Sequence, residues 1–165
     1  MQALIKDGQR VLNDPWYISG LEDSGKPATQ PLVPIAQFLD QHQEWADSDA
    51  VIGVWLSEDD MPDALEPYLD RLDVIALHLP KFADGRAFSK ARLLRQRFGF
   101  QGEIRLTGDF LPDQAAYYAR CGVNAFACRT EEEADIALAL LAPFSVHYQS
   151  DAHQTALFER RHETR

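Results

Sequence analysis

Apolar runs of strand length alternate with amphipathic runs of helix length over residues 50–143. The pattern predicts four strands, at 50–56, 73–79, 103–108 and 124–129. It also predicts a helix after each strand, at 61–72, 87–99, 112–122 and 131–142. The first strand, AVIGVWL, is a continuous apolar run, which is typical of a strand covered on both faces. Four consecutive strand–helix units predict an α/β fold with a mainly parallel sheet.

The ends of the predicted helices carry their own signals. Thr130 and Glu133 have the spacing of a capping box, and Pro143 ends the helix that follows them. Pro112 stands where the third helix begins, and Gly122 follows its end. These boundaries support the division of this region into strand–helix units.

The N-terminal residues follow a different pattern. Apolar residues flank Asp7-Gly8, a dipeptide that favours a tight turn with positive φ, so residues 2–18 are predicted to form a β-hairpin. Residues 19–34 are rich in Pro, Gly and Ser, which predicts an irregular connection. A short helix is predicted over residues 34–44, with three apolar side chains on one face.

Together these elements predict one α/β domain over residues 1–150, with the strand–helix units at 50–143, and a polar tail at 151–165. The sheet could be open, or it could be curved like half of a (β/α)8 barrel. A half-barrel exposes the edges of its sheet, and exposed edges need covering. The N-terminal hairpin could cover one edge, and a partner subunit in a homo-oligomer could cover another.

Composition narrows the class of protein. The chain has 165 residues and a formal net charge of −10, which disfavours binding to nucleic acid. No apolar stretch is long enough to span a bilayer and the N-terminus lacks a signal-peptide core, so we expect no membrane and a cytoplasmic location. Cys121 and Cys128 have no metal-ligand spacing and are predicted to be structural thiols. No motif for a cofactor or a metal is present, so neither is expected.

Positive charge is concentrated in one stretch of this acidic chain. Residues 81–105 hold seven Lys or Arg residues against two acidic residues. The stretch begins at the carboxyl end of a predicted strand, which is where ligands bind in both open parallel sheets and barrels. Lys81, Arg86 and Ser89 could therefore bind a small anion there, because guanidinium and ammonium groups suit oxyanions. The candidate supporting residues are Asp84, Gly85, Arg92 and Gln114.

The same cations could instead have one of two different roles. They could pair with nearby acids in a structural network, or they could form a surface on which a partner docks. On the predicted helix, Lys90 and Arg97 fall opposite the apolar face and are expected to be solvated or to contact a partner. Arg95 falls within the apolar arc, so it is expected to hold structure.

Acidic and imidazole groups supply the remaining candidates for chemistry. Asp109 ends a predicted parallel strand and could be catalytic, although loop hydrogen bonding accounts for it equally well. Asp113 lies in the first turn of a helix, where a carboxylate is favoured as a cap. His78, within a strand, is predicted to be a satisfied core or interface residue. Tyr117 and Tyr118 are predicted to be packing residues.

Several motifs together resemble one bacterial family. They are the run PKFADGRAFSKARLLR, the turn GDFLPDQ and the helix-to-strand passage ARCGVNAF, with weaker likeness in LIKDG, DPW and FSVHYQ. In this combination the chain resembles, over about residues 3–149, the uncharacterised family called domain of unknown function 934. Members of that family are often labelled as oxidoreductases of sulfite reduction. The resemblance implies a pathway, assimilatory sulfur metabolism, and sulfite reductase as a partner.

Three functions follow as hypotheses. The first is an accessory protein of assimilatory sulfite reduction, which acts with the reductase and binds a small oxyanion at Lys81 and Arg86. The second is an enzyme on a barrel-like scaffold that acts on a small anionic substrate, with Arg86 as the clamp and Asp109 as the group that moves a proton. The third is a structural protein whose oligomer completes the barrel.

Overall fold

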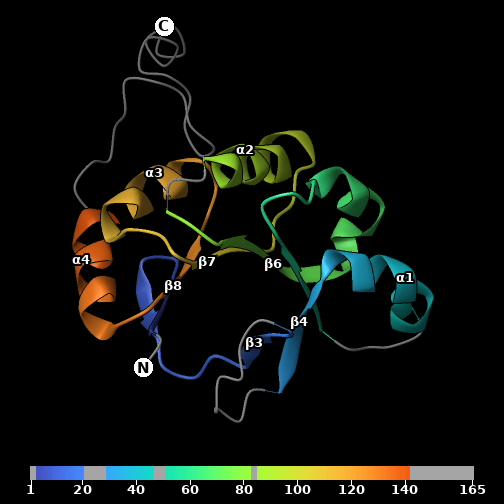
Figure 1. Cartoon of the computed structure of the whole chain (residues 1–165), viewed down its shortest axis with the longest axis horizontal. Coiled ribbons are helices and arrows are strands. Elements are labelled where there is room, and N and C mark those ends of the chain that lie inside the picture. Colours follow the sequence, from blue (N-terminus) through green and yellow to red (C-terminus); the bar gives the residue numbers. More distant parts are fainter. Residues whose placement is uncertain (1–2, 21–28, 47–50, 83–84, 142–165) are drawn as a thin grey trace, which may run out of the picture.

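The sheet of the protein is curved into a half-barrel, as Figure 1 shows for a computed structural model that describes residues 3–20, 29–46, 51–82 and 85–141. The predicted tail at 151–165 and Pro143 lie outside these residues. The strands are β1 (Ala3–Lys6), β2 (Gln9–Val11), β3 (Trp16–Ile18), β4 (Gln30–Pro34), β5 (Ile52–Leu56), β6 (Leu72–Leu79), β7 (Glu103–Gly108) and β8 (Ala125–Cys128). The α-helices are α1 (Ile35–Ala46), α2 (Arg86–Arg92), α3 (Ala115–Arg120) and α4 (Glu131–Leu141).

The strands form one sheet in the order β2-β1-β8-β7-β6-β5-β4-β3. From β3 to β8 all neighbours are parallel, whereas β1 pairs antiparallel with β8 and with β2. The predicted α/β class with a mainly parallel sheet is confirmed, and the curved alternative is the correct one. Because β4 to β8 follow one another in both sequence and space, their carboxyl ends share one rim of the half-barrel.

Figure 1 shows α1 to α4 around the outer, convex side of the sheet. Alternate residues of each strand point to that side and form the main core with the helices, among them Val54, Ile75, Leu77, Ile104 and Leu106. These side chains are fully buried or nearly so. The continuous apolar runs in the sequence reflect this layer together with the covered concave face behind it.

Two expectations for the N-terminal residues are corrected. The hairpin is confirmed as β1 and β2, with Asp7 and Gly8 at positive φ in the turn, but it ends at Val11. Residues 16–18 form β3 at the opposite edge of the sheet, and Gln30–Pro34, predicted to be irregular, forms β4. The strand was not predicted because a proline stands at each end of the apolar pair Leu32-Val33, and proline cannot donate a hydrogen bond to a neighbouring strand.

The helical segments are less regular than their pattern predicts. The segment between β5 and β6 is a 3-10 helix, η1 (Pro62–Arg71), with Pro67 inside it. The helix α2 continues as a π-helical turn, η2 (Leu93–Arg97), and α3 is preceded by a short 3-10 turn, η3 (Pro112–Gln114). The capping box before α4 is half confirmed. Thr130 Oγ1 accepts the N–H of Glu133 at 3.1 Å, but the Glu133 carboxylate accepts the N–H of Arg129 instead.

The concave face of the half-barrel is covered by the chain itself. The segment 12–15 joins β2 at one edge to β3 at the other, and the contact of Asp14 with Arg105 places it across this face. It is held there by Arg105 at the centre of β7, whose guanidinium pairs with Asp14 at 2.6 Å and with Glu103 at 2.6 Å. Lys6 pairs with the second oxygen of Glu103 at 2.9 Å. Burial opposes the charge of Arg105, but the hydrogen bond to Asp14 and the charge of Glu103 outweigh it and raise the Arg105 pKa.

Arg105 should be the most sensitive charged position of the fold. We expect Arg105→Leu to lower the free energy of unfolding by about 3–5 kcal/mol, because it leaves the part-buried Asp14 without its partner and the buried Glu103 with Lys6 alone. The matched control is Arg97→Leu, which removes an exposed arginine 3.7 Å from Asp63 and should cost below about 1 kcal/mol. Urea unfolding of both variants measures the difference, and equal losses would contradict the role given to Arg105.

Candidate functional site

The loops that leave β5, β6 and β7 meet at the carboxyl rim of the half-barrel. In the first loop, the N–H and the hydroxyl of Ser57 both donate to the Asp60 carboxylate at 2.7 Å. From α2, the ammonium of Lys90 donates to the carbonyl oxygens of Ser57 at 2.6 Å and Glu58 at 2.8 Å. Lys90 is buried, so the expectation of a solvated Lys90 is wrong. Its side of α2 faces this loop, which lies above the convex face of the sheet.

The predicted anion-binding residues are spread along the outer surface of this rim. Lys81 and Ser89 are exposed, and Arg86 forms an exposed ion pair with Asp59 at 2.8 Å. Gly85 precedes α2 in a helical conformation and accepts the N–H of Phe88. The predicted supporting residue Asp84 lies outside the described residues. Of the predicted set, the structure therefore joins Arg86 to an acid of the first loop.

A small cavity lies beneath Arg86. It is lined by Ser57, Glu58, His78, Arg86 and Lys90 together with apolar residues of β5, β6 and α2. Its volume is about 10 Å³, which is close to the space that one water molecule needs. An oxyanion at Arg86 would therefore bind on the surface of the rim and compete with Asp59 for the guanidinium.

Gln114 joins the loop after β6 to the loop after β7. Its side-chain oxygen accepts the N–H of Leu111 at 3.0 Å, and its amide donates to the carbonyl of Phe82 at 3.1 Å. The second loop starts at Gly108, where φ is +88° and a Cβ would collide with the carbonyl oxygen of Leu79. Only glycine fits this turn, which brings the GDFLPDQ segment against the end of β6.

Asp109 forms part of an ion-pair chain on the same rim. Its carboxylate pairs with Arg129 at 2.8 Å, and Arg129 also pairs with Glu133 at 2.7 Å. The hydrogen bond from the Arg129 side chain, with further donors from the backbone, lowers the pKa of Glu133. The contacts of Asp109 thus link the loop after β7 to the start of α4. Asp113 is exposed in the first turn of η3.

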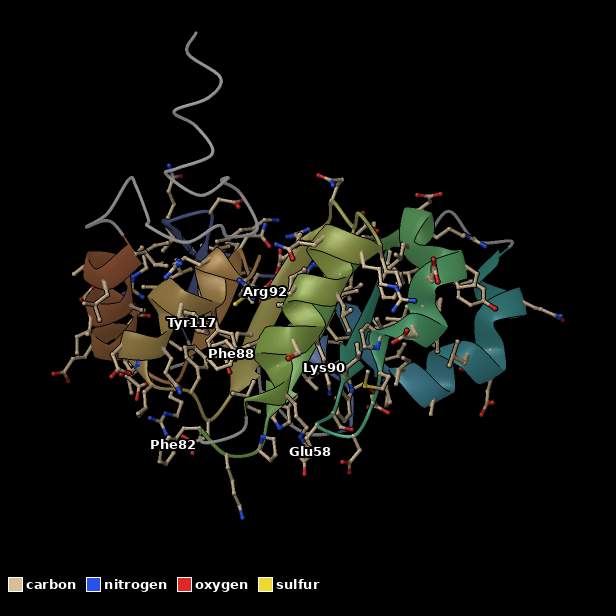
Figure 2. All side chains as sticks on the ribbon, turned by 90° about the horizontal axis from the view of Figure 1, so that it is seen from above. Glu58, Phe82, Phe88, Lys90, Arg92 and Tyr117 are labelled. Carbon is tan, nitrogen blue, oxygen red and sulfur yellow. The ribbon has the colours of Figure 1, made fainter. Side chains whose placement is uncertain are left out.

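An aromatic surface lies at α2 and α3, where Figure 2 shows Phe88 and Tyr117 between the two helices and Phe82 on the adjoining loop after β6. The rings of Phe88 and Tyr117 meet edge to face at 4.8 Å, and Phe88 stacks on Tyr118 at 3.9 Å. Tyr118 is fully buried, as its predicted packing role requires, but Tyr117 is 47% exposed. Arg92, one helical turn after Phe88, is exposed beside it.

We call this region the α2–α3 surface. It consists of Lys81, Phe82, Phe88, Ser89, Arg92, Leu111, Gln114 and Tyr117, whereas Arg86 lies on the side of α2 that faces the loop after β5. Sequence reasoning found its charged members through the local excess of positive charge. It missed the aromatic members, because an apolar residue at helical spacing is assigned to the core unless the neighbouring helix is known. In the structure, the hydrogen bond from Gln114 to the Phe82 carbonyl shows that the loop after β6 lies beside the start of α3.

A second group of polar side chains lies on the concave face near the same rim. The Nδ1 atom of His78 is 3.2 Å from Thr107 Oγ1, and its ring meets the indole of Trp55 edge to face at 6.0 Å. His78 is half-buried, in keeping with the prediction of a satisfied strand histidine. Thr107 also donates a long hydrogen bond to the Leu77 carbonyl.

Arg95 has the structural role that its position on the apolar arc predicts. Its guanidinium donates to the carbonyl oxygens of Phe100, Gly102 and Gly122, and to the side chain of Asn124. It therefore ties the end of the α2 segment to the loops before β7 and β8.

Within the described part of the chain, no cluster of three or more metal-ligating side chains is found, and no helix is long and apolar enough to cross a membrane. Cys121 and Cys128 are buried free thiols. Burial, with the negative charge of Glu133, raises the pKa of Cys128 to about 11. Cys128 is thus a poor nucleophile at neutral pH, since the thiolate is the reactive form.

Cys128 gives the protein a pH dependence that can be measured. An unfolded thiol ionises near its ordinary pKa of about 9, before the native thiol does. The free energy of unfolding should therefore fall as the pH rises from about 9 to 11. Urea unfolding at pH 8 and pH 10 should show a larger loss for the wild type than for Cys128→Ala. Rapid alkylation of native Cys128 by iodoacetamide at pH 8 would contradict the raised pKa.

The comparison with known families places these motifs in one group of proteins. No curated protein matches the chain. The model of a family described as bacterial protein of unknown function, DUF934, matches residues 53–158, which is more than half of the chain. The matched region includes β5 to β8, both loops joined by Gln114, and the α2–α3 surface. The chain belongs to the DUF934 family of bacterial proteins.

Proposed function

We propose that the protein is a cytoplasmic accessory protein of assimilatory sulfite reduction that docks onto sulfite reductase through the α2–α3 surface. The label attached to the family that the sequence resembles supports the pathway. The α2–α3 surface supports the mode of action, because it combines exposed aromatic and cationic side chains, the residue types enriched where proteins bind one another. A small oxyanion bound beside Lys81, Arg86 and Ser89 would be a secondary property of the same rim.

One observation carries the proposal. The motifs that resemble the family contain buried residues that the fold needs, such as Ala91 and Leu94 in α2 and Gly108 in the turn. They also contain residues that the core does not need, and these lie together on the outside. These exposed residues are Lys81, Phe82, Arg86, Ser89, Arg92 and Leu111. A binding role explains why such residues accompany the structural ones.

The growth of a deletion strain on different sulfur sources tests the pathway. We expect the strain to fail on sulfate and on sulfite and to grow on sulfide or cysteine, because the step lost is the reduction of sulfite. Wild-type protein should restore growth. Normal growth of the deletion strain on all four sources would refute the assignment to sulfite reduction.

Complementation by surface variants tests the docking surface in the same strain. The double variant Phe82→Ala, Tyr117→Ala should not restore growth on sulfite. The matched control is Met61→Ala, Ile136→Ala, which removes two side chains of comparable exposure from different parts of the surface. Equal rescue by both double variants, at equal protein levels, would show that the α2–α3 surface is dispensable for the pathway.

A second function, an enzyme acting on a small anionic substrate, is favoured by a different observation. His78, Thr107 and Trp55 lie together on the concave face near the carboxyl ends of three adjacent strands, where enzymes with barrel folds place their sites. His78 is a group that can exchange a proton near neutral pH. In this alternative, which matches the oxidoreductase label, Arg86 would hold the anion and Asp109 or His78 would move the proton.

Thermal unfolding in the presence of sulfite, sulfate or phosphate separates the two functions. The enzyme alternative predicts that one of these anions at about 100 times its Kd stabilises the native state by ~2.7 kcal/mol, which would raise Tm by roughly 5–10 °C. Arg86→Ala should abolish the rise. An unchanged Tm with all three anions, or the same rise in Arg86→Ala, would remove the anion site and leave docking as the function.

A further inference from the structure

We propose that the α2–α3 surface binds an acidic segment of its partner that carries an aromatic or aliphatic side chain. The inference rests on the proposed function in taking this surface as a docking site, and it adds the chemistry of the segment that docks. Two properties of the surface lead to it, namely a rigid apolar centre and a cationic border.

The apolar centre is formed by three side chains on neighbouring loops and helices. Phe82 is 50% exposed, Tyr117 is 47% exposed and Leu111 is 37% exposed. Figure 2 shows Tyr117 beside Phe88, and Phe82 on the rim loop of the same side of the molecule, which Gln114 joins to the start of α3. Exposed apolar side chains that cluster in this way mark interaction sites more often than scattered ones do.

Contacts beneath the surface hold this centre in place before a partner arrives. Tyr117 rests edge to face on Phe88, and Phe88 stacks on the buried ring of Tyr118. The backbone of Phe82 is fixed by the amide of Gln114, which also caps the turn at Leu111. A partner side chain would therefore meet a Tyr117 ring that is already held, beside a Phe82 whose backbone is held, and this lowers the loss of conformational entropy on binding.

Three cations lie beside the apolar centre, and one exposed acid, Asp113, stands two residues after Leu111. Lys81 precedes Phe82, Arg92 lies one helical turn from Phe88, and the guanidinium of Arg120 lies 5.9 Å from the centre of the Tyr117 ring. Among the residues that the structure describes, neither Lys81 nor Arg92 forms an ion pair. A protein with a net charge of −10 thus has cations beside one exposed aromatic cluster. This charge is complementary to an acidic segment and opposed to a basic one.

A second copy of the chain offers acidic segments of its own, but these suit the surface less well. The start of α4 carries Glu132 beside the exposed Ile136, yet Glu131 and Asp135 are already paired with Arg10. A contact between two different surfaces of identical chains either closes into a ring or grows into a filament. We therefore assign the surface to a different protein.

Site-specific photo-crosslinking tests the inference in living cells. Tyr117 is replaced by the photoreactive amino acid p-benzoylphenylalanine, the cells are irradiated, and the crosslinked peptide is sequenced by mass spectrometry. We expect an acidic segment with an apolar residue at the crosslink. A probe in place of Phe82 should capture the same segment, and it serves if the Tyr117 variant does not fold. The matched control is a probe in place of Ile136, which is 46% exposed on α4 and should not capture it.

Substitutions of Arg92 test whether charge attraction contributes to binding of the acidic segment. Arg92→Glu should lower the yield of the crosslink by about tenfold, because it places like charges opposite one another, whereas Arg92→Lys should retain it. Neither change should alter Tm, since Arg92 is exposed. Equal yields from both Arg92 variants would overturn the inference.

The identity and the composition of the captured segment are judged separately. An acidic segment of a protein other than sulfite reductase supports the inference and refutes the proposed function. A neutral or basic segment of sulfite reductase does the reverse. Capture of nucleic acid, of this chain itself, or of nothing by either probe would overturn the inference.

Discussion

The ion pairs of Arg105 with Asp14 and Glu103 hold a cover over the concave face, which a half-barrel otherwise leaves open. A sheet with its helices on one face leaves the opposite face without a cover, and closure into a complete barrel is not available to it. Here the segment 12–15 crosses that face, and Asp14 is held to Arg105 across 91 positions of the sequence. A buried ion pair is favourable only where its geometry is good and the remaining carboxylate oxygens also have partners. Lys6 supplies that partner for the second oxygen of Glu103. The same crossing joins the two edges of the sheet, so a second copy that completed the barrel would have to displace it.

Because the concave face is covered, the side chains that a ligand or a partner can reach lie at the rim and on the outer surface. Apolar side chains fill the concave face between β3 and β6, and Trp16 packs over Gly53, where a Cβ would meet it at 2.6 Å. Described residues of the loops after β6 and β7, such as Phe82 and Leu111, remain open to solvent. Gly108 and Gln114 fix these loops against each other, which gives the protein a preorganised surface built on rigid elements. A chain without a cofactor motif can in this way still hold particular side chains in a fixed arrangement for a binding partner.

The parts of the fold that could be predicted are those that depend on local pattern. Strands β5 to β8 and the helices between them follow from apolar periodicity, and the first hairpin follows from Asp7-Gly8. Strand β4 could not be recognised, because its prolines argue against a strand and only pairing with β3 and β5 shows that it is one. The burial of Lys90 was missed for a related reason. Helical geometry shows which face a residue shares, but not that a loop will cover the face opposite the core.

The positive stretch 81–105 shows how far charge alone can indicate a site. Its seven cations divide into two groups once their contacts are known. Lys90 and Arg95 bind backbone carbonyl oxygens and Arg105 binds the carboxylates of Asp14 and Glu103, so these three hold the fold together. The remaining four are exposed, and of these Lys81 and Arg92 border the aromatic residues of the α2–α3 surface, whereas Arg86 pairs with Asp59 on the other side of α2. A single anion pocket would require the cations to converge, whereas here they are separated by the helix that carries them. Their distribution over an area, with apolar rings between them, suits the side chains of a protein partner better than it suits one small ion.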